Sequence, residues 1–289
     1  MSIKKKYFQR RHIVEFLVKT AMRIALVIVA GALGLILWTI ITRGLPSLSW
    51  SMVTQIPKGG YYMGKEGGIL NAIIGSAYLA SGGTLLAILL SLPIALYLKA
   101  YLGDSKWGDY VRLALDVLWG IPSIVYGAFG FALMIMLGMR ASLLAGIIAL
   151  ALVTLPIMTR AMDEVIRRMP VDLEHAALAL GSTKFEVAIQ VVTRQMLPGI
   201  ITGILLAFGR GIGDAASVLF TAGYTDRIPT SLMNPTASLP LAVFFQLGSP
   251  YPEVRERGYA AALILTIIVL IVSLGSRLLA SRLNKYTVK

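Results

Sequence analysis

The chain has 289 residues, of which 57% are hydrophobic and only 14% are charged, and its mean hydropathy is +0.77. A soluble domain carries about a quarter charged residues, so this composition excludes an ordinary soluble protein. The sequence holds no cysteine, which excludes a disulfide, a catalytic thiol and a thiolate metal site. The net charge of +13 raises the possibility of nucleic-acid binding, which the placement of the charges has to decide.

The chain begins with a basic segment, residues 1–20, followed by an apolar run from Ile24. This start resembles a signal peptide, but the run is too long for one and no small-x-small cleavage site follows it. We therefore interpret it as a basic cytoplasmic tail followed by a retained first membrane helix.

Five runs contain no Asp, Glu, Lys or Arg, namely 24–42, 67–98, 117–139, 141–159 and 258–276. About 20 apolar residues suffice to cross the hydrocarbon core of a bilayer, so each run predicts a membrane helix. A sixth run, 199–222, qualifies only if Arg210 and Asp214 are tolerated inside it. We predict an all-α polytopic protein with spans near 22–42, 69–98, 112–137, 142–159, 199–222 and 258–280. Residues 21–289 then form one transmembrane domain.

The basic residues are distributed unevenly across these predicted spans. If both termini are cytoplasmic, 19 of the 27 Lys and Arg residues lie inside, seven lie outside, and Arg210 lies within a span. This is the positive-inside pattern of a cytoplasmic-membrane protein. It accounts for the basic composition without nucleic acid and predicts a multi-pass protein with both ends in the cytoplasm.

Three prolines, Pro93, Pro122 and Pro156, lie inside or near the ends of the central spans. Proline removes an intrahelical hydrogen-bond donor and bends the helix. Three bends in the central block favour a translocation unit over a simple anchor, although ordinary membrane-helix prolines are the alternative.

A polar segment of about 39 residues, 160–198, separates the fourth and fifth spans. Alanine and leucine favour helix after Pro170, Gly181 is expected to end that helix, and Ser182 or Thr183 could cap a second one. Two short helices joined at a glycine would form a knob able to enter a groove of a partner. The alternative is a loop that packs under its own bundle.

The predicted fifth span contains an arginine and an aspartate. Placing Arg at the bilayer centre costs about 2.5–3.5 kcal/mol, so such residues usually mark a solute path. On a continuous helix Arg210 and Asp214 would share one face, either as a charge-cancelling pair or as an anion site. Gly209, Gly211 and Gly213 would serve close helix packing or open the backbone.

Two longer loops are predicted on the outer side, 43–68 and 223–257. The second contains an apolar stretch, 239–247, that is too short to span a bilayer. It predicts either a gate-side helix near the docking face of a solute receptor or a helix lying in the lipid interface.

The cytoplasmic segment resembles a known motif. HAALALG, from His175 to Gly181, with Leu197 and Pro198 downstream, is similar to the EAA loop of ABC importer permeases. The usual Glu is His175 here, and Glu174 precedes it. The resemblance implies a coupling helix that docks into an ATPase subunit, and it assigns coupling roles to a short list: Glu174, His175, Ala176, Ala177 and Gly181.

Three further segments resemble phosphate-specific ABC importer permeases of the PstA type: GGILNAI at 67–73, GIPSIVYG at 120–127 and GRGIGDAA at 209–216. This resemblance implies a type I ABC importer permease fold and places Arg210 and Asp214 on the substrate path. It also implies a second homologous permease, two ATPase subunits and an extracytoplasmic phosphate-binding protein as partners.

The sequence lacks a G-x-x-x-x-G-K-[ST] phosphate-binding loop and any metal motif, and its only histidines are His12 and His175. We therefore expect a non-enzymatic subunit without a cofactor, with ATP and Mg²⁺ bound by the partner ATPase. The alternatives are a permease for sulfate, molybdate or tungstate, an ion-gradient-driven anion carrier, and a membrane scaffold or sensor that transports nothing.

Overall fold

The structure is a computed structural model, and it describes residues 2–58, 66–103 and 105–283. The α-helices are α1 (Ser2–Gly44), α2 (Trp50–Thr54), α3 (Leu70–Tyr97), α4 (Lys106–Gly120), α5 (Ser123–Met136), α6 (Leu143–Arg167), α7 (Val171–Ala179), α8 (Lys184–Glu186), α9 (Thr193–Ile212), α10 (Leu239–Leu247) and α11 (Pro252–Leu283). Two π-helical stretches, η1 (Leu98–Leu102) and η2 (Val187–Val192), continue α3 and precede α9. Strands β1 (Pro57–Lys58) and β2 (Glu66–Gly67) form an antiparallel pair.

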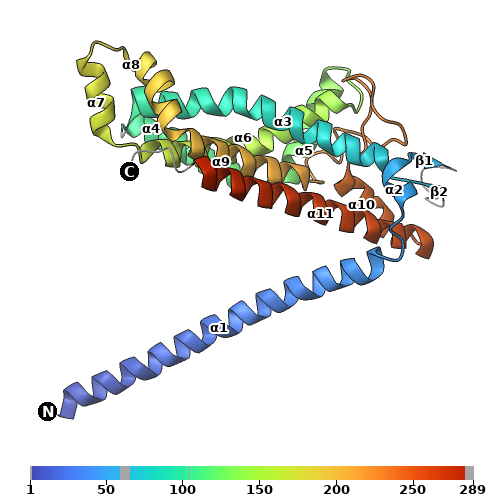
Figure 1. The fold of residues 1–289 in the computed structure, drawn as a ribbon, viewed down its shortest axis with the longest axis horizontal. Helices are drawn as coiled ribbons and strands as arrows, with labels where there is room; N and C mark the ends of the chain where they lie inside the picture. Colours follow the sequence, from blue (N-terminus) through green and yellow to red (C-terminus); the bar gives the residue numbers. More distant parts are fainter. Residues whose placement is uncertain (1, 59–65, 104, 284–289) are drawn as a thin grey trace.

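Helices α3, α6, α9 and α11 run side by side as an elongated bundle (Figure 1). The α7–α8 segment lies at one end of this bundle, which we call the α7 end. The β1–β2 pair, α2 and α10 lie at the opposite end, which we call the hairpin end. Helix α1 leaves the bundle at the hairpin end and diverges from it.

Five described helical stretches are long and apolar enough to cross a membrane: Val14–Gly44, Leu70–Leu102, Leu143–Arg167, Lys184–Ile212 and Pro252–Leu278. Helices α4 and α5 qualify together as a sixth span, bent by 94° at the break between them. The all-helical, six-span prediction is confirmed if this bent pair counts as one span. The predicted proline bend is sharpest at Pro122, which lies in that break, whereas Pro93 and Pro156 lie inside α3 and α6.

Several predicted boundaries were wrong. The basic start is helical from Ser2 and continuous with the first span. Helix α6 runs on to Arg167, so the polar segment begins later than residue 160. Helix α9 ends at Ile212, and residues 213–222 form turns instead of the end of a span. The stretch at 239–247 is helical as predicted, but its first four residues are buried in protein, which leaves only its second half free for an interface.

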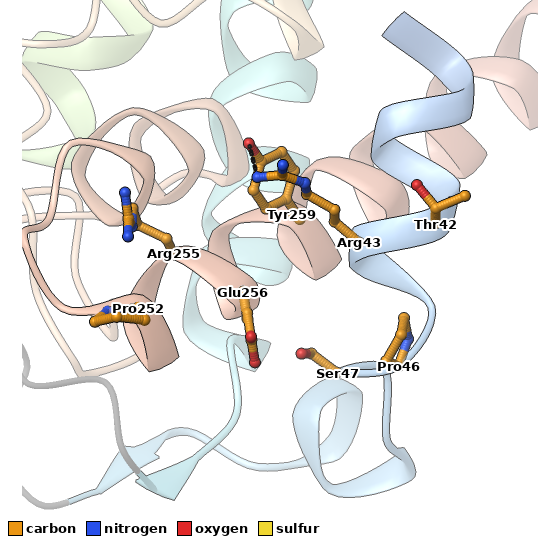
Figure 2. Close-up of a pocket in the computed structure, with 8 residues that line it drawn as sticks. All are labelled: Thr42, Arg43, Pro46, Ser47, Pro252, Arg255, Glu256 and Tyr259. Atoms are coloured by element: carbon orange, nitrogen blue, oxygen red, sulfur yellow. Dashed lines mark hydrogen bonds between the residues drawn. The ribbon is translucent and has the colours of Figure 1, made fainter. Parts of the chain in front are cut away.

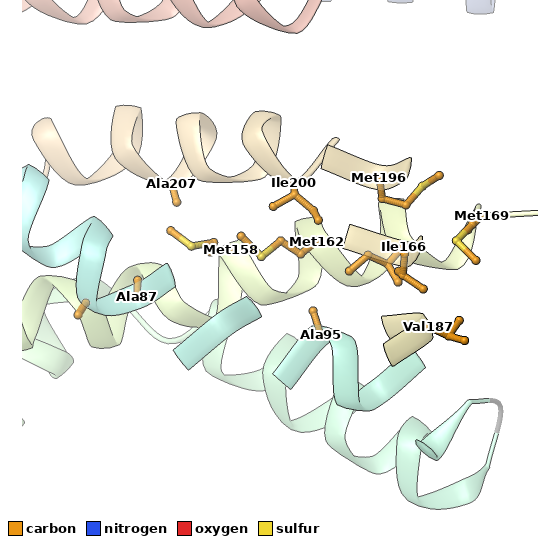
Figure 3. Close-up of a cluster of buried hydrophobic side chains, with 12 residues drawn as sticks. Ala87, Ala95, Met158, Met162, Ile166, Met169, Val187, Met196, Ile200 and Ala207 are labelled. Atoms are coloured by element: carbon orange, nitrogen blue, oxygen red, sulfur yellow. The ribbon is translucent and has the colours of Figure 1, made fainter. Parts of the chain in front are cut away.

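The core at the α7 end consists of flexible methionines facing small side chains. Met158 and Met162 of α6 point toward Ala87 of α3 and Ala207 of α9 and are fully buried (Figure 3). Small residues let the helix backbones approach closely, and methionine fills the irregular space that remains. This packing fixes α3, α6 and α9 relative to one another.

A chain of ion pairs attaches α4 to α6. Arg112 Nε donates to the Oδ2 atom of the fully buried Asp163 at 2.9 Å, and Arg160 Nη1 reaches the same carboxylate at 3.2 Å. Arg160 Nε also donates to Asp116 at 2.6 Å. Asp116 therefore pairs with Arg160 of α6, while Arg112 of its own helix binds Asp163. These pairs explain why the end of α6 tolerates charged residues.

Removing the shared carboxylate should destabilise the fold. Asp163→Asn leaves Arg112 buried and uncompensated, and breaking such a pair costs about 3–5 kcal/mol of unfolding free energy. Asp109→Asn is the matched control, because Asp109 also faces Arg112, at 3.5 Å, but is 69% exposed. That control should cost less than about 1 kcal/mol. Equal losses, measured by reversible unfolding in mixed micelles, would contradict this account of the core.

Candidate functional site

The break between α4 and α5 lies level with the middle of α6. Asp116 and Arg112 of α4 pair with Arg160 and Asp163 of α6, so the two helices run antiparallel. Continuing this register to the break at 121–122 leads to the centre of Leu143–Arg167. In lipid, irregular backbone is tolerated only where protein or a water-filled cavity surrounds it. The break therefore marks a place where the bundle is not simply exposed to lipid.

Side chains satisfy the backbone freed by this break. The Tyr126 hydroxyl donates to the Leu118 carbonyl at 2.8 Å, and the Ile121 amide donates to the same carbonyl at 3.2 Å. Tyr126 thus closes the last turn of α4 from within α5. Within the GIPSIVYG segment, Tyr126 makes this local bond, which the sequence pattern did not predict.

Asp214 connects the start of α5 to the irregular segment after α9. Its Oδ1 accepts a hydrogen bond from Ser123 Oγ at 3.0 Å, and its Oδ2 accepts from the Ser217 amide at 3.2 Å and from the Ser217 hydroxyl. A carboxylate near the first turn of a helix also interacts favourably with the helix dipole. At Gly127 an added Cβ would lie 2.7 Å from the Ala216 carbonyl, so a side chain there would push the two segments apart.

Arg210 is placed differently. It is exposed in the last turn of α9, and its guanidinium makes no hydrogen bond or ion pair with any other described residue. The neighbouring Gly211 lies against Leu150, about 10 Å of helix from the Leu143 end of α6. Arg210 therefore lies in the half of the bundle toward the hairpin end, whereas the sequence placed it near mid-bilayer.

The expectation that Arg210 and Asp214 share one helix face was wrong, because α9 ends between them at Ile212. The three glycines also differ in their surroundings. A Cβ at Gly209 would meet nothing within 4 Å, one at Gly211 would contact Leu150 at 3.5 Å, and Gly213 lies beyond the helix end. Among the described residues, Gly211 packs against α6, whereas Gly209 and Gly213 pack against no helix, so a packing role for those two requires another subunit.

The hydrogen bonds of Asp214 determine what the Arg210 guanidinium can bind. The carboxylate of Asp214 is already occupied by donors from Ser123 and Ser217 and does not neutralise Arg210. An uncompensated guanidinium is unfavourable in lipid and favourable toward an oxyanion, whose oxygens match its planar donors. Arg210, next to irregular backbone, can therefore bind or pass a hydrated anion.

The α7 end presents a second functional surface. Helix α7 has no fully buried residue, and His175, Ala176, Ala179 and Leu180 are exposed, Leu180 at 88%. Ala177, in contrast, packs against the core. Glu174 points back into its own chain, where its carboxylate lies 3.2 Å from the Lys99 ammonium of η1. The residues exposed for a partner are thus those beside Glu174.

The turn after α7 follows the sequence prediction. Gly181 has φ +90°, a conformation that glycine adopts without strain. Thr183 caps α8 in a capping box, in which its hydroxyl accepts from the Glu186 amide and the Glu186 carboxylate accepts from the Thr183 amide. The predicted pair of short helices joined at a glycine is confirmed.

Comparison with known proteins identifies the family. Residues 87–285 match the model of the binding-protein-dependent transport system inner membrane component. The chain belongs to this family. It is 38% identical over 249 residues to a phosphate transport system permease protein PstA of Xylella fastidiosa (strain 9a5c), covering 84% of each chain. It is 34% identical over 243 residues to the protein of that name from Haemophilus influenzae, covering 84% of this chain and 85% of the relative.

Solved structures of low sequence identity share the fold. The inward-facing MetNI methionine ABC transporter contains a chain with a TM-score of 0.62 and 15% identity, matched over 74% of this chain and 95% of that one. A bacterial ABC transporter that imports the acidic polysaccharide alginate matches with a TM-score of 0.55 and 12% identity, over 89% and 95%. These matches confirm the predicted ABC importer permease fold.

Family membership confirms three further predictions. The chain is similar to phosphate permeases of the PstA type, as its segments had indicated. It is a multi-pass protein of the inner membrane and the non-catalytic membrane component of its transporter. Because such transporters depend on a binding protein and an ATPase, partners of these two kinds are also confirmed.

Asp214→Ala should loosen the junction between α5 and residues 213–217. It removes the acceptor of the Ser123 and Ser217 donors, and leaving such donors unsatisfied costs about 1–3 kcal/mol. We expect faster hydrogen exchange in a peptide covering residues 120–130, measured by mass spectrometry in nanodiscs. Asp226→Ala is the control, because Asp226 is exposed and has no hydrogen bond to any described residue. Identical exchange in both variants would refute the bridging role of Asp214.

Proposed function

We propose that this chain is the membrane permease subunit of an ATP-driven importer of inorganic phosphate. In this proposal it lines half of the translocation path and pairs with a second homologous permease. Two ATPase subunits bind its cytoplasmic face and hold the ATP and Mg²⁺, while this chain carries no cofactor. A phosphate-binding protein delivers the anion from outside. The observation that carries the proposal is the Arg210 guanidinium, which forms no ion pair with any described residue and lies four residues before Asp214, the residue that binds the start of α5.

Phosphate as cargo is supported by local chemistry and by the relatives' names. Phosphate carries about −1.5 to −2 charges near neutral pH, and a guanidinium binds its oxygens through two parallel hydrogen bonds. Four residues after Arg210, Asp214 lies at the N-terminus of α5 and binds the hydroxyls of Ser123 and Ser217. Discontinuous helices whose N-termini point at anionic solutes are a recurrent arrangement in transporters.

The α7 end is the cytoplasmic side in this proposal. Basic residues gather at this end of the spans, with Lys99 on η1, Lys106 at the start of α4 and Arg168 directly after α6, as the positive-inside rule requires. The hairpin end then faces outward, where the binding protein docks. Both termini are cytoplasmic, since α1 and α11 each run from one side to the other and meet near the hairpin end.

Coupling follows from how α7 is attached. The exposed face of His175, Ala176, Ala179 and Leu180 enters a groove of the ATPase, and Gly181 with the Thr183 cap fixes the turn that presents it. Glu174 faces its own bundle instead of the partner. Its ion pair with Lys99 transmits movement of α7 to η1 and α3. ATP-driven closure of the two ATPases then rotates the central helices and alternates access to Arg210.

Arg210→Gln should lower ATP-dependent phosphate uptake roughly tenfold to a hundredfold, since a hydrogen bond to a charged group contributes about 1.5–3 kcal/mol. Arg210→Lys keeps the charge but loses the planar donors, and we expect intermediate uptake. Uptake is measured as labelled phosphate entering proteoliposomes of the whole complex. Arg11→Gln, in the exposed N-terminal segment, is the charge-matched control.

Normal uptake by Arg210→Gln in an assembled complex would remove Arg210 from the path. Uptake that persists without ATP but requires an ion gradient would replace the importer with a carrier.

Ala179→Cys should form a cross-link to an ATPase subunit, whereas Ala177→Cys should not. Ala179 lies on the exposed face of α7, and Ala177 packs against the core of its own bundle. Since the chain has no natural cysteine, each variant carries a single thiol. Short bifunctional reagents in native membranes, followed by mass spectrometry, provide the measurement. Cross-linking from Ala177→Cys alone would mean that the opposite face of α7 docks.

A further inference from the structure

A polar pocket of about 390 Å³ lies where α1 and α11 cross at the hairpin end (Figure 2). Its volume falls within the range of small-molecule sites, about 300–1,000 Å³. It is lined by Thr42, Arg43, Pro46, Ser47, Pro252, Arg255, Glu256 and Tyr259. None of these residues belongs to the translocation or coupling sites described above.

Close backbone contact forms the pocket. At Gly44 an added Cβ would lie 2.6 Å from the Tyr259 carbonyl, so α1 crosses α11 with backbone against backbone. The Arg43 guanidinium lies over the Tyr259 ring at 5.3 Å from its centre and donates to the Tyr259 hydroxyl at 3.4 Å. This crossing holds the walls of the pocket in place within a single chain.

The pocket carries charges of both signs. Arg43 provides a cation held in position by the Tyr259 ring. The side chains of Arg255 and Glu256 are exposed and have no hydrogen bond or ion pair with any other described residue. In Figure 2 the Glu256 carboxylate and the Ser47 hydroxyl extend into the same space between α11 and the turn after α1. A ligand that complements the pocket therefore carries both an anionic and a cationic group.

The position of the pocket matches the headgroup layer of a membrane. Trp50 and Tyr251 are exposed beside it, at 81% and 54%, and such aromatic side chains collect at membrane interfaces. From the crossing, α1 and α11 diverge (Figure 1). Both helices expose apolar side chains along their length, such as Leu33 and Leu35 of α1 and Leu270 and Ile271 of α11. The pocket thus lies at the point from which α1 and α11 diverge, and we call the region between their exposed apolar side chains the wedge.

We propose that this pocket binds the headgroup of a zwitterionic, amine-bearing phospholipid such as phosphatidylethanolamine. The phosphodiester binds Arg43 and Arg255, the ammonium binds Glu256, and the acyl chains lie in the wedge between α1 and α11. The Glu256 carboxylate repels a free phosphate anion, which distinguishes this site from one that collects the transported solute.

The test uses the whole complex in nanodiscs that contain equal amounts of phosphatidylethanolamine and phosphatidylglycerol, with bound lipids counted by native mass spectrometry. The double variant Arg255→Gln/Glu256→Gln should retain about tenfold less phosphatidylethanolamine, as expected for the loss of about 1.4 kcal/mol. Asp226→Asn/Arg227→Gln is the matched control, because it neutralises an adjacent pair of exposed charges outside the pocket and should retain the wild-type amount.

A second arm separates the possible ligands. Glu256→Gln alone should abolish the preference for phosphatidylethanolamine over phosphatidylglycerol, which lacks the amine. Millimolar inorganic phosphate should not displace the lipid. Equal lipid retention by the double variant and its control, or displacement by inorganic phosphate, would overturn the proposal. Phosphate uptake is measured on the same samples, so a failure of this site and a failure of the transport assignment are separately visible.

Discussion

The constraint on which this structure depends is that backbone polar groups inside a bilayer need partners from the protein. Continuous helices satisfy most of these groups, but the break at 121–122 and the segment that follows α9 interrupt the helical hydrogen bonding. There the partners are side chains, with Tyr126 on the Leu118 carbonyl and Asp214 on the Ser217 amide. Because Asp214 binds serines, it forms no ion pair with Arg210. The irregular backbone and the lack of an ion pair between these two residues therefore have a common origin.

At the α7 end, two carboxylates bind basic side chains of the same chain. Asp163 binds Arg112 and Arg160 and thereby fixes α4 against α6 on the α7 side of the break. Glu174 is bound to Lys99, which leaves the neighbouring small and apolar residues of α7 for a partner. A movement imposed on α7 can thus reach α3 through an ion pair, while α6 and α4 move together as a unit. Much of α4 and α5 is exposed in the single chain. That exposed surface is where we expect the second permease to lie.

Hydropathy and short motifs predicted the class, the number of spans, the short helix at 239–247 and the turn at Gly181. These features depend on local properties, namely apolar run length, glycine conformation and helix capping. The helix ends were predicted less well. Arg160 and Asp163 looked like the start of a cytoplasmic segment because each is charged, yet both lie in α6, where partners from α4 neutralise them. Residues 213–222 looked like the end of a span because they are apolar, yet Ser217 and Ala216 pack against α5 as turns.

The membrane architecture and the family follow from the sequence alone, because burial in lipid selects composition over long stretches. The pairing of the charges follows only from the folded arrangement of the helices. Arg112 binds Asp163 and Asp116 binds Arg160 across two helices, and Asp214 binds serines rather than Arg210. Ion pairing falls off within a few ångströms. It therefore depends on helix ends and crossings, which are set by contacts between residues far apart in the chain.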